Sequence, residues 1–339
     1  MEISGKTLIR LMNSLAPVQL AESWDNPGLQ IGDPSVPVQR VMVALDITEE
    51  NIEYAEKNHI QMIIAHHPFL FKPMKRIDMS NFKGNLVSRI IKNDILIFAA
   101  HTNLDTAFEG VNDALAGKLG LIRCEGLVPV RGNPLMILTA DFGASVPEGL
   151  LNMLKSDFSG TAAFCLFGNG EIRIKAKQSV LGAVLSAVKK FQPKHYEILQ
   201  CVDHEENDFM GRIGELPEPM QGMEALQFIK ESLGIPVLKY CGDASRVVRK
   251  VALLGGAGAE FSSLARSRGA DLYVTGDVKY HEAQDAAAEG LLLADGGHYY
   301  TERVLIPYLA DILRKTAARN QWNLTVYEDQ VSTDIFRYI

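Results

Sequence analysis

The chain has 339 residues, of which 47% are hydrophobic and 22% are charged, and its formal net charge at pH 7 is −7. This composition is typical of a globular protein of about two domains, and no apolar segment approaches the roughly 20 residues that a membrane-spanning helix needs. The acidic balance argues against binding to the phosphates of DNA or RNA, because such binding depends on clustered lysine and arginine. We therefore expect neither a membrane nor a nucleic-acid partner.

The first third of the chain alternates the signals of helices and buried strands. Residues 1–17 predict an amphipathic helix, and the apolar runs at 39–48, 61–68 and 94–105 predict strands. Such alternation favours a largely parallel sheet with right-handed connections. Residues 68–83 form a long connection that contains two prolines. Connections of this kind are often lids over a site.

The middle of the chain has a different order of elements. Signals of strand, helix, strand, strand, helix and strand follow one another, with a Gly-Asn-Gly turn between the second and third strands. This order is that of a ferredoxin-like unit. Acidic residues and then prolines at 203–220 predict a linker back to the rest of the chain. We therefore expect an α+β domain at 129–208, inserted into a core of residues 1–128 and 209–339.

The last third repeats the alternation of strands and helices. Strands are predicted at 249–258, 270–277 and 291–297, and an apolar stripe at 304–313 predicts a C-terminal helix. These elements predict a second α/β lobe. Three glycines between 255 and 258 lack the further glycine that a dinucleotide-binding motif needs. A tight turn required for packing is therefore favoured over an anion site.

Histidines and carboxylates follow three of the predicted strands, at the point where each strand ends. Because ligands of open α/β sheets bind at the carboxyl ends of strands, these side chains predict one shared site. Simpler interpretations remain: backbone groups could satisfy the histidine pair, and the carboxylates could only cap or stabilise helices. Asp25 and Asp277 either line the same cleft or only begin a turn or helix. The candidate residues are His66 and His67, then His101 and Asp105, and finally His298 and Glu302.

Imidazole and carboxylate groups together are typical ligands of Zn, Fe, Mn, Co or Ni. Five of the candidates, His66, His67, Asp105, His298 and Glu302, are too many for one tetrahedral ion. Adjacent side chains diverge, so His66 and His67 are expected to hold different ions of a pair about 3.5–4 Å apart, bridged by a carboxylate. The four cysteines form no Cys-x-x-Cys pair, which predicts no thiolate site and favours a cytoplasmic protein.

Seven segments, in this order, resemble the GTP cyclohydrolase I type 2 family, also called the Nif-three-like dinuclear metal proteins. The resemblance covers roughly residues 1–128 and 209–339. The combination of adjacent histidines, the HTNLD block and the block from Gly-His to Glu makes it specific. The segments are SWDNPGLQIG, AHHPFLF, AAHTNLDTAFEGVNDALA, GRIGELPEPM, ALLGGAGAEF, YVTGDVKYHEAQDA and ADGGHYYTE.

The resemblance implies an α/β fold in which two lobes form a core with two divalent ions. His66 and Asp105 would hold one ion, His67 and His298 would hold the other, and Glu302 would bridge them. The resemblance also implies a toroidal homohexamer whose sites face an internal cavity. Longer members carry an inserted PII-like or CutA-like domain, which agrees with the ferredoxin-like order of elements at 129–208.

The leading functional hypothesis is a dinuclear metal-dependent hydrolase, with His101 as the candidate catalytic residue, either for proton transfer or for supporting a metal ligand. The family name implies GTP as substrate and hydrolysis that opens the purine ring at a carbon–nitrogen bond. A phosphoester or another cyclic amide is chemically as compatible. The alternative is a non-catalytic metal-binding regulator or adaptor, in which the ions hold the lobes together and the inserted domain senses a ligand or partner. DNA binding is the third hypothesis, and the net charge disfavours it.

Overall fold

The computed structural model describes residues 1–158, 162–337 and 339. It divides the chain into two compact units: Met1–Val128 with Phe209–Ile339, and Pro129–Asp208. All six predicted site residues lie in the larger unit, which consists of two lobes. None of the helices in the described ranges is long and apolar enough to cross a membrane. The cytoplasmic location stays a prediction.

The first lobe is built on a five-stranded sheet that is parallel except at one edge. The three strands predicted from the first third of the chain are present, and they lie at the centre of this sheet. Each ends a few residues before the predicted boundary, where polar side chains begin. The edge strands were not predicted. The strand order is β15 (Thr325–Glu328), β4 (Arg40–Ala44), β5 (Met62–Ala65), β6 (Leu96–Ala99) and β2 (Gly28–Ile31), of which β2 is antiparallel to β6.

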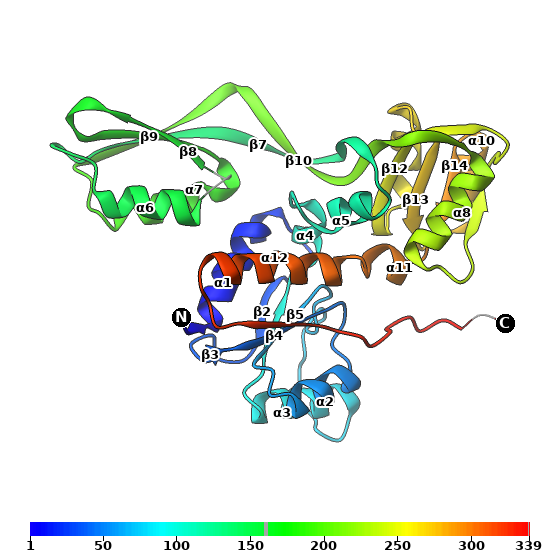
Figure 1. The fold of residues 1–339 in the computed structure, drawn as a ribbon, viewed down its shortest axis with the longest axis horizontal. Coiled ribbons are helices and arrows are strands. Elements are labelled where there is room, and N and C mark those ends of the chain that lie inside the picture. The colour runs from blue at the N-terminus through cyan, green and yellow to red at the C-terminus, as the bar shows by residue number, and fades with distance from the viewer. Residues whose placement is uncertain (159–161, 338) are drawn as a thin grey trace. The chain divides into compact units, whose positions relative to one another are not determined.

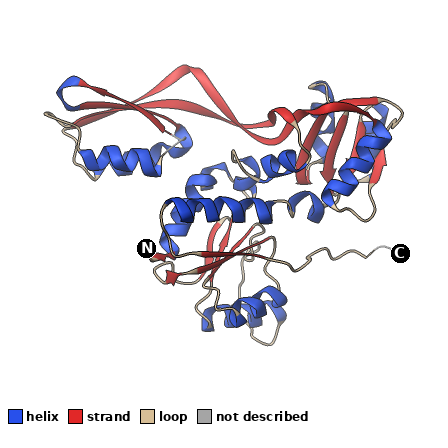
Figure 2. Cartoon of the chain, viewed as in Figure 1, coloured by secondary structure: helices blue, strands red, loops and turns tan. Residues whose placement is uncertain are grey.

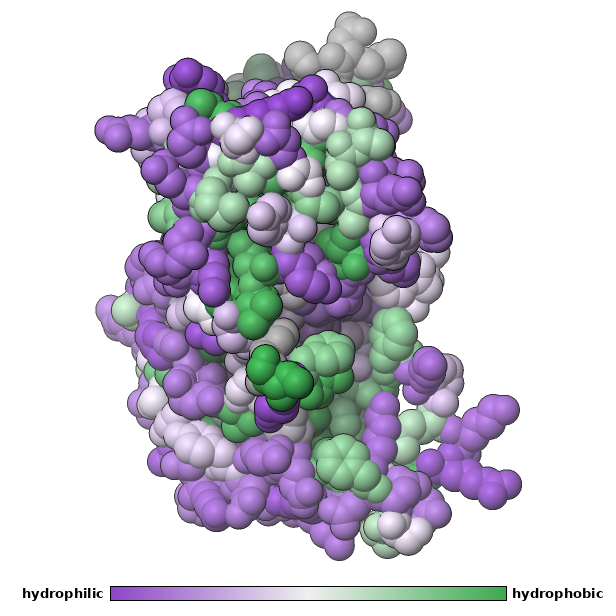
Figure 3. All heavy atoms as spheres, turned by 90° about the vertical axis from the view of Figure 1, so that its right-hand side faces the viewer, coloured by the Kyte–Doolittle hydropathy of each residue, from purple (hydrophilic) through white to green (hydrophobic). Residues whose placement is uncertain are grey.

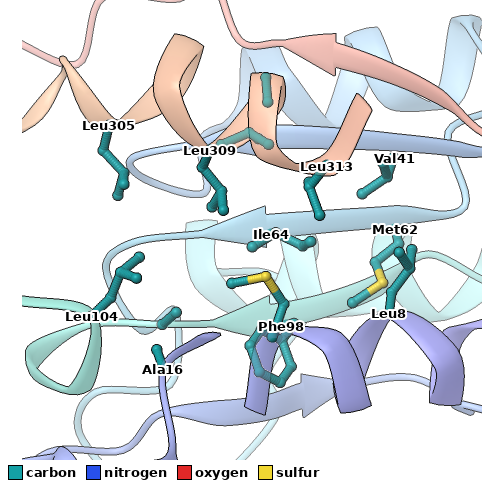
Figure 4. Close-up of a cluster of buried hydrophobic side chains, with 14 of the residues drawn as sticks. Leu8, Ala16, Val41, Met62, Ile64, Phe98, Leu104, Leu305, Leu309 and Leu313 are labelled. Atoms are coloured by element: carbon teal, nitrogen blue, oxygen red, sulfur yellow. The ribbon is translucent and has the colours of Figure 1, made fainter. Parts of the chain in front are cut away.

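Helices cover both faces of this sheet (Figures 1 and 2). Strand side chains alternate between faces, so Val41 and Val43 of β4 pack on one side while Met42 packs on the other. On the first side, Leu305, Leu309 and Leu313 of the C-terminal helix enter the same cluster (Figure 4). Full burial of each such side chain contributes about 1.5–3 kcal/mol. The helices are α1 (Gly5–Leu15) and α12 (Leu305–Arg319) on this side, and α2 (Glu49–Lys57) and α3 (Phe82–Lys92) on the other.

Short elements complete the first lobe. The N-terminal helix was predicted, and Leu8 and Met12 form its buried stripe. Helix α2 begins at a capping box, in which the Thr48 hydroxyl accepts from the Asn51 backbone and the Asn51 side chain accepts from the Thr48 backbone. The remaining elements are β1 (Ile3–Ser4), η1 (Val18–Leu20), β3 (Pro37–Val38), α4 (Thr102–Thr106) and α5 (Val111–Lys118).

The second lobe also has a sheet with a parallel centre. The strands β12, β13 and β14 are parallel to one another, whereas β11 and β10 are antiparallel to their neighbours. Helices α8 and α5 pack on one face, and α9 and α10 pack on the other. The strand order is β11 (Lys239–Cys241), β14 (Leu292–Asp295), β13 (Leu272–Gly276), β12 (Val247–Ala257) and β10 (His195–Gln221). The helices of this lobe are α8 (Gly222–Leu233), η3 (Ala259–Phe261), α9 (Ser262–Ser267), α10 (Tyr280–Ala288) and α11 (His298–Glu302).

The smaller unit has strands in the order β10, β7, β9 and β8. Its two helices share a core with β9, in which Leu150, Ile174 and Val188 are fully buried. Thr161, the first residue of one predicted strand, lies outside the described residues. The elements are β7 (Ile122–Asp141), α6 (Glu148–Asp157), β8 (Ala162–Phe167), η2 (Gly168–Gly170), β9 (Glu171–Lys177) and α7 (Gln178–Lys189).

The linker predicted at 203–220 is wrong, because β10 continues as one strand to Gln221. The prolines suggested a break, since a proline cannot donate a hydrogen bond within a sheet. Pro217 and Pro219 lie where the register between β10 and β12 shifts, between Glu215 and Met220. A bulge of this kind tolerates residues that lack an N–H group. The strand therefore passes through a sequence that is typical of a linker.

Hydrophilic residues predominate on the face shown in Figure 3, and hydrophobic residues lie between them. This pattern agrees with the ordinary charged fraction of the chain. Single exposed apolar residues are normal on protein surfaces. The polar side chains that require an explanation are therefore those that are buried.

Candidate metal centre

The predicted site residues meet between the two lobes of the larger unit. His66 and His67 directly follow β5, while His101 follows β6 and precedes the short helix that carries Asp105. The ring centroids of His66 and His67 are 5.0 Å apart, and those of His66 and His101 are 5.3 Å apart. From the second lobe, His298 lies 5.4 Å from His67 by the same measure. The carboxyl ends of strands from both sheets thus bring all these imidazoles together.

Glu302 lies at the centre of this group and is only 3% exposed. Its Oε2 atom is 3.1 Å from His67 Nε2 and 3.2 Å from His298 Nε2. Its Oε1 atom is 3.7 Å from His66 Nε2. Asp105 Oδ1 is 3.6 Å from the same His66 atom. One carboxylate therefore presents one oxygen to His66 and the other to His67 and His298.

Each histidine is oriented through its Nδ1 atom, so that Nε2 remains for another partner. Histidines that bind metals are typically held in this way by a carboxylate or a backbone carbonyl. The pairs are His66 with the Ala100 carbonyl oxygen (2.8 Å), His67 with Asp46 (2.8 Å), His101 with Asp25 (2.9 Å) and His298 with Asp277 (2.8 Å).

Four buried polar atoms in this cluster make no hydrogen bond, although they lie in two pairs of imidazole and carboxylate atoms, 3.1 and 3.6 Å apart. Among the side chains that the structure describes, they are the only such atoms, and all four belong to predicted ligands. Leaving one buried polar atom without a partner costs about 1–3 kcal/mol, so a stable fold rarely keeps four in one place unless something binds them. The atoms are Nε2 of His66, Nε2 of His67, Oδ1 of Asp105 and Oε2 of Glu302.

The spacing of these donor atoms fits divalent cations. Two donors bound at about 2.1 Å to one tetrahedral ion lie about 3.4 Å apart, close to the separations around Glu302. Two sets of residues have ligand atoms that all lie within 4.8 Å of one another. Both contain His67, and one of them contains His101, which the sequence placed outside the ligand set. The sets are His66, His67 and His101, and His67, His298 and Glu302.

The carboxylates strongly perturb the pKa values of the histidines. Burial lowers the pKa of His67, but the carboxylates of Asp46 and Glu302 outweigh burial and raise it to about 10. The pKa of His298 is raised to about 9, mainly by Glu302 and against the effect of burial. Burial would raise the pKa of Glu302, yet the surrounding imidazoles hold it well below its ordinary value. The histidines of the cluster therefore hold protons that a cation can replace, and Glu302 holds a negative charge that a cation can neutralise.

Backbone packing fixes the position of Glu302. Gly256 has a positive φ of 69°, and a Cβ atom added there would lie 2.3 Å from Glu302 Oε1. The Gly256 N–H donates to the hydroxyl of Thr301, the residue before Glu302 (3.0 Å). Residues 255–257 form the end of β12, where its register with β13 is irregular, and not the predicted tight turn; they do have a packing role beside Glu302. Gly256 makes room for the carboxylate.

A buried asparagine connects the two lobes beside the cluster. The Asn112 side chain donates to the Asp105 carbonyl oxygen and accepts from the Gly255 N–H, each at 2.9 Å. Asn112 is fully buried. The helix that carries Asp105 is thus tied to the end of β12 beside Glu302.

Three orienting carboxylates were only partly found from the sequence. Asp25 and Asp277 were possible cleft residues, and they bind His101 and His298. Asp46 was missed, although it follows β4 at the same edge of the sheet as His66 and His67. That position after a buried strand is the signal that could have revealed it.

Asp25 illustrates how firmly these carboxylates are held. It accepts from the Thr102 hydroxyl at 2.6 Å and from the Thr102 backbone at 3.1 Å, as well as from His101. Burial raises its pKa, but these hydrogen bonds and the charge of His101 outweigh burial and lower it to about 2. Asp25 is therefore ionised and fixed beside the cluster.

Comparisons with known proteins agree over almost the whole chain. Residues 3–335 match the family model described as Duf34/NIF3 (NGG1p interacting factor 3). A relative from Bacillus subtilis strain 168 is 31% identical over 370 residues, and one from Listeria innocua is 32% identical over 369 residues. Both are named GTP cyclohydrolase 1 type 2 homolog, and each alignment covers 99% of both chains.

Solved structures of related proteins have the same fold. A Bacillus cereus protein related to NIF3 is 33% identical, with a TM-score of 0.85 and 99% of each chain covered. A Staphylococcus aureus protein is 28% identical, with a TM-score of 0.78 and the same coverage. The mixed α/β fold is therefore shared over both units of the chain.

Proposed function

The chain belongs to the Duf34/NIF3 family, and from this premise we propose that it is a dinuclear metal-dependent hydrolase. The observation that supports this most strongly is the set of four buried imidazole and carboxylate atoms that make no hydrogen bond and lie together between the lobes. Imidazole and carboxylate donors without thiolate suit Zn, Fe, Mn, Co or Ni. Two ions rather than one account for a carboxylate whose oxygens face different histidines.

The proposed ligands divide around Glu302. His66 and Asp105 hold one ion, His67 and His298 hold the other, and Glu302 bridges them. His101 was expected to transfer protons or to support a metal ligand; its distance from His66 and His67 instead supports its addition as a further ligand. Asp25, Asp46 and Asp277 then serve as positioning residues, because each fixes the ring of one histidine ligand.

The proposed reaction is the hydrolysis of a carbon–nitrogen bond in a cyclic amidine, with GTP as the first candidate substrate. Its support is the name of the relatives, GTP cyclohydrolase 1 type 2 homolog. A bound pair of divalent ions supplies a Lewis acid for the substrate and lowers the pKa of water. The residues of the chain hold the donor set rigid, and the surrounding imidazoles keep the carboxylate of Glu302 ionised by lowering its pKa.

The finer points of architecture are also proposals. We propose that residues 129–208 form a ferredoxin-like domain of the PII or CutA kind, supported by the order β7, α6, β8, β9, α7 and β10. We propose further that the chain assembles as a homohexamer, as the family resemblance implies. Light scattering on the purified protein tests the hexamer, which predicts a mass six times that of one chain.

The experiment combines metal content with turnover. We expect two equivalents of metal per chain by mass spectrometry of the purified protein, and loss of GTP by chromatography. In Asp105→Asn an amide replaces the carboxylate, so at least one equivalent of metal and about 100-fold of activity should be lost. Asp334→Asn is the matched control, because Asp334 is equally buried but binds the Tyr300 hydroxyl.

The outcomes separate the two functions considered. Protein with no stoichiometric metal would refute the dinuclear centre. Full metal occupancy without turnover of GTP, phosphoesters or cyclic amides would refute the hydrolase and favour the metal-binding regulator. Equal losses in Asp105→Asn and Asp334→Asn would show that the effect comes from folding and not from a lost ligand.

A further inference from the structure

A pocket lies beside His67. Its volume is about 230 Å³, and its walls come from the end of β4, the segment after β5 and the start of α3. Typical sites for drug-sized ligands occupy about 300–1,000 Å³, so this pocket holds one ring with a small substituent rather than a whole nucleotide. The lining residues are Asp46, Ile47, His67, Pro68, Phe69, Phe82 and Lys83.

Two phenylalanines contribute to the walls of the pocket. Phe69 and Phe82 both line it, and the Phe82 side chain is 63% exposed although it is large and apolar. The Lys83 ammonium lies 5.0 Å from the centroid of the Phe69 ring. Aromatic side chains with an open face bind planar rings by stacking, at about 1–3 kcal/mol for each ring.

The charge at the pocket favours an anion. Lys83 provides a cation, and the pocket lies at the N-terminus of α3, whose first turn contains no acidic residue. The Asn81 side chain caps only the Gly84 N–H there. The carboxylate in the wall, Asp46, is engaged with His67 at 2.8 Å. An ammonium group and a helix N-terminus together attract an acidic group.

The pocket is held open by its flanking backbone. A Cβ atom added at Gly84 would lie 2.0 Å from the Asp78 carbonyl oxygen, so the segment after Phe69 packs directly against the start of α3. At the other end of this segment, Leu70 is bound by Gln30 and by Asn26 (3.1 and 2.9 Å). The predicted lid at 68–83 is thus tied at both ends, and it forms a wall of the pocket.

We propose that this pocket is a binding site for a small molecule that has a planar aromatic ring and an acidic group. The ring stacks on the exposed side chain of Phe82, and the acidic group binds Lys83 at the start of α3. The pocket shares His67 with the proposed metal centre, but binding in the pocket does not depend on bound metal.

Phenyl phosphate tests the pocket, and methyl phosphate is its control because it has the same charge without the ring. Calorimetric titration of the full-length protein should show phenyl phosphate binding about tenfold more tightly. Phe82→Ala should remove this advantage while leaving methyl phosphate unchanged. Lys83→Gln should weaken both ligands about tenfold, whereas Lys83→Arg keeps the affinity. Lys72→Gln, a lysine on the same segment outside the pocket, should leave both unchanged.

Each titration is repeated after metal removal, which separates this proposal from the metal centre. The ring-dependent advantage and its loss in Phe82→Ala should persist in metal-free protein. Protein that never contains metal but keeps this pattern would refute the hydrolase and leave the pocket intact. Equal affinities for the two phosphates, or variants of Phe82 and Lys83 that bind like the wild type, would overturn the pocket.

Discussion

The adjacent residues His66 and His67 present their Nε2 atoms to different oxygens of Glu302, because different groups hold their rings. The Nδ1 atom of His66 faces the carbonyl of Ala100, which follows β6, and that of His67 faces Asp46, which follows β4. The two rings are inclined at 43° with their centroids 5.0 Å apart. A single His-His step can therefore supply one donor to each side of Glu302.

The raised pKa values of the histidines predict how stability depends on pH. His67 and His298 have an ordinary pKa of 6.5, raised to about 10 and about 9 in the folded protein without metal. Protonation therefore stabilises this fold fully below about pH 6.5, and the stabilisation is lost as pH rises through 9 to 10. We expect the Tm of the metal-free protein to fall by about 3 °C or more between pH 7 and 10, measured by calorimetry.

Metal binding should show the opposite trend, because ions must displace the same protons. Metal affinity should rise with pH up to about 9–10, with release of protons on binding.

The control for the predicted fall in Tm is the double variant His67→Gln and His298→Gln, which lacks both titrating groups. Its Tm should depend less on pH than that of the wild type. A metal-free wild type with the same Tm at pH 7 and pH 10 would contradict the assignment.

The sequence could predict which residues meet but not how their rings are turned. His66, Asp105 and Glu302 follow buried strands or lie on the next turn, and strand ends of one sheet face the same edge. The role of Asp46 depends on a 2.8 Å contact between side chains 21 positions apart. Nothing in periodicity or spacing encodes such a contact. The positions of the candidate ligands can therefore be predicted from a sequence. The groups that orient the histidine rings are found only in the folded structure.

At the scale of an element, the end of β12 is a place where adding a single methyl group should have a defined effect. Gly256→Ala places a Cβ atom 2.3 Å from Glu302 Oε1 and forces alanine into a positive φ of 69°. We expect the variant to lose about 1–2 kcal/mol of unfolding free energy from the backbone strain. It should also lose bound metal, because the carboxylate that faces both sides of the cluster has to move. Thermal unfolding and metal analysis measure the two effects separately.

Gly234→Ala is the control for this prediction. Gly234 ends α8 with a φ of 65°, and no atom lies within 4 Å of a Cβ added there. The two variants should therefore lose similar stability, while only Gly256→Ala loses metal. Retention of metal by Gly256→Ala would mean that Glu302 can be displaced without consequence.

The elements that could be predicted from the sequence were those with a continuous apolar run or a clear hydrophobic period. The central strands β4, β5 and β6 are buried on both faces and appear as continuous apolar runs. The edge strand β2 was missed because it has only four residues, and none of them is fully buried. The extension of β10 was missed because its pairing with β12 overrides the local preference of its prolines. Short edges and bulged strands depend on their neighbours, which a single sequence does not show.

At the scale of the whole molecule, the candidate ligands come from two lobes and none comes from the inserted unit. His66, His67, His101 and Asp105 belong to the first lobe, and His298 and Glu302 belong to the second. The proposed ions would therefore link the lobes, in addition to the hydrogen bonds of Asn112. Residues 129–208 should accordingly be dispensable for the centre.

The place of insertion allows this to be tested by shortening the chain. A Cβ atom added at Gly126 would meet Phe209, and one added at Gly211 would meet Leu127, so the two stems lie side by side. The buried Arg212 guanidinium fixes the second stem to α5 by donating to both oxygens of Asp113 (2.7 and 2.6 Å). Neighbouring strands can be joined by a two-residue Asn-Gly turn. Val128 can thus be connected directly to Phe209 through Asn-Gly.

We expect the shortened protein to fold and to bind as many metal ions as the full chain, with affinity within about threefold because every proposed ligand and orienting group is retained. Circular dichroism reports folding, and mass spectrometry reports bound metal. Asp105→Asn in the shortened chain should lose metal as it does in the full chain, which shows that the same site is occupied. A folded short chain that binds less metal would mean that the inserted unit contributes to the centre. The independence of the two units would then be refuted.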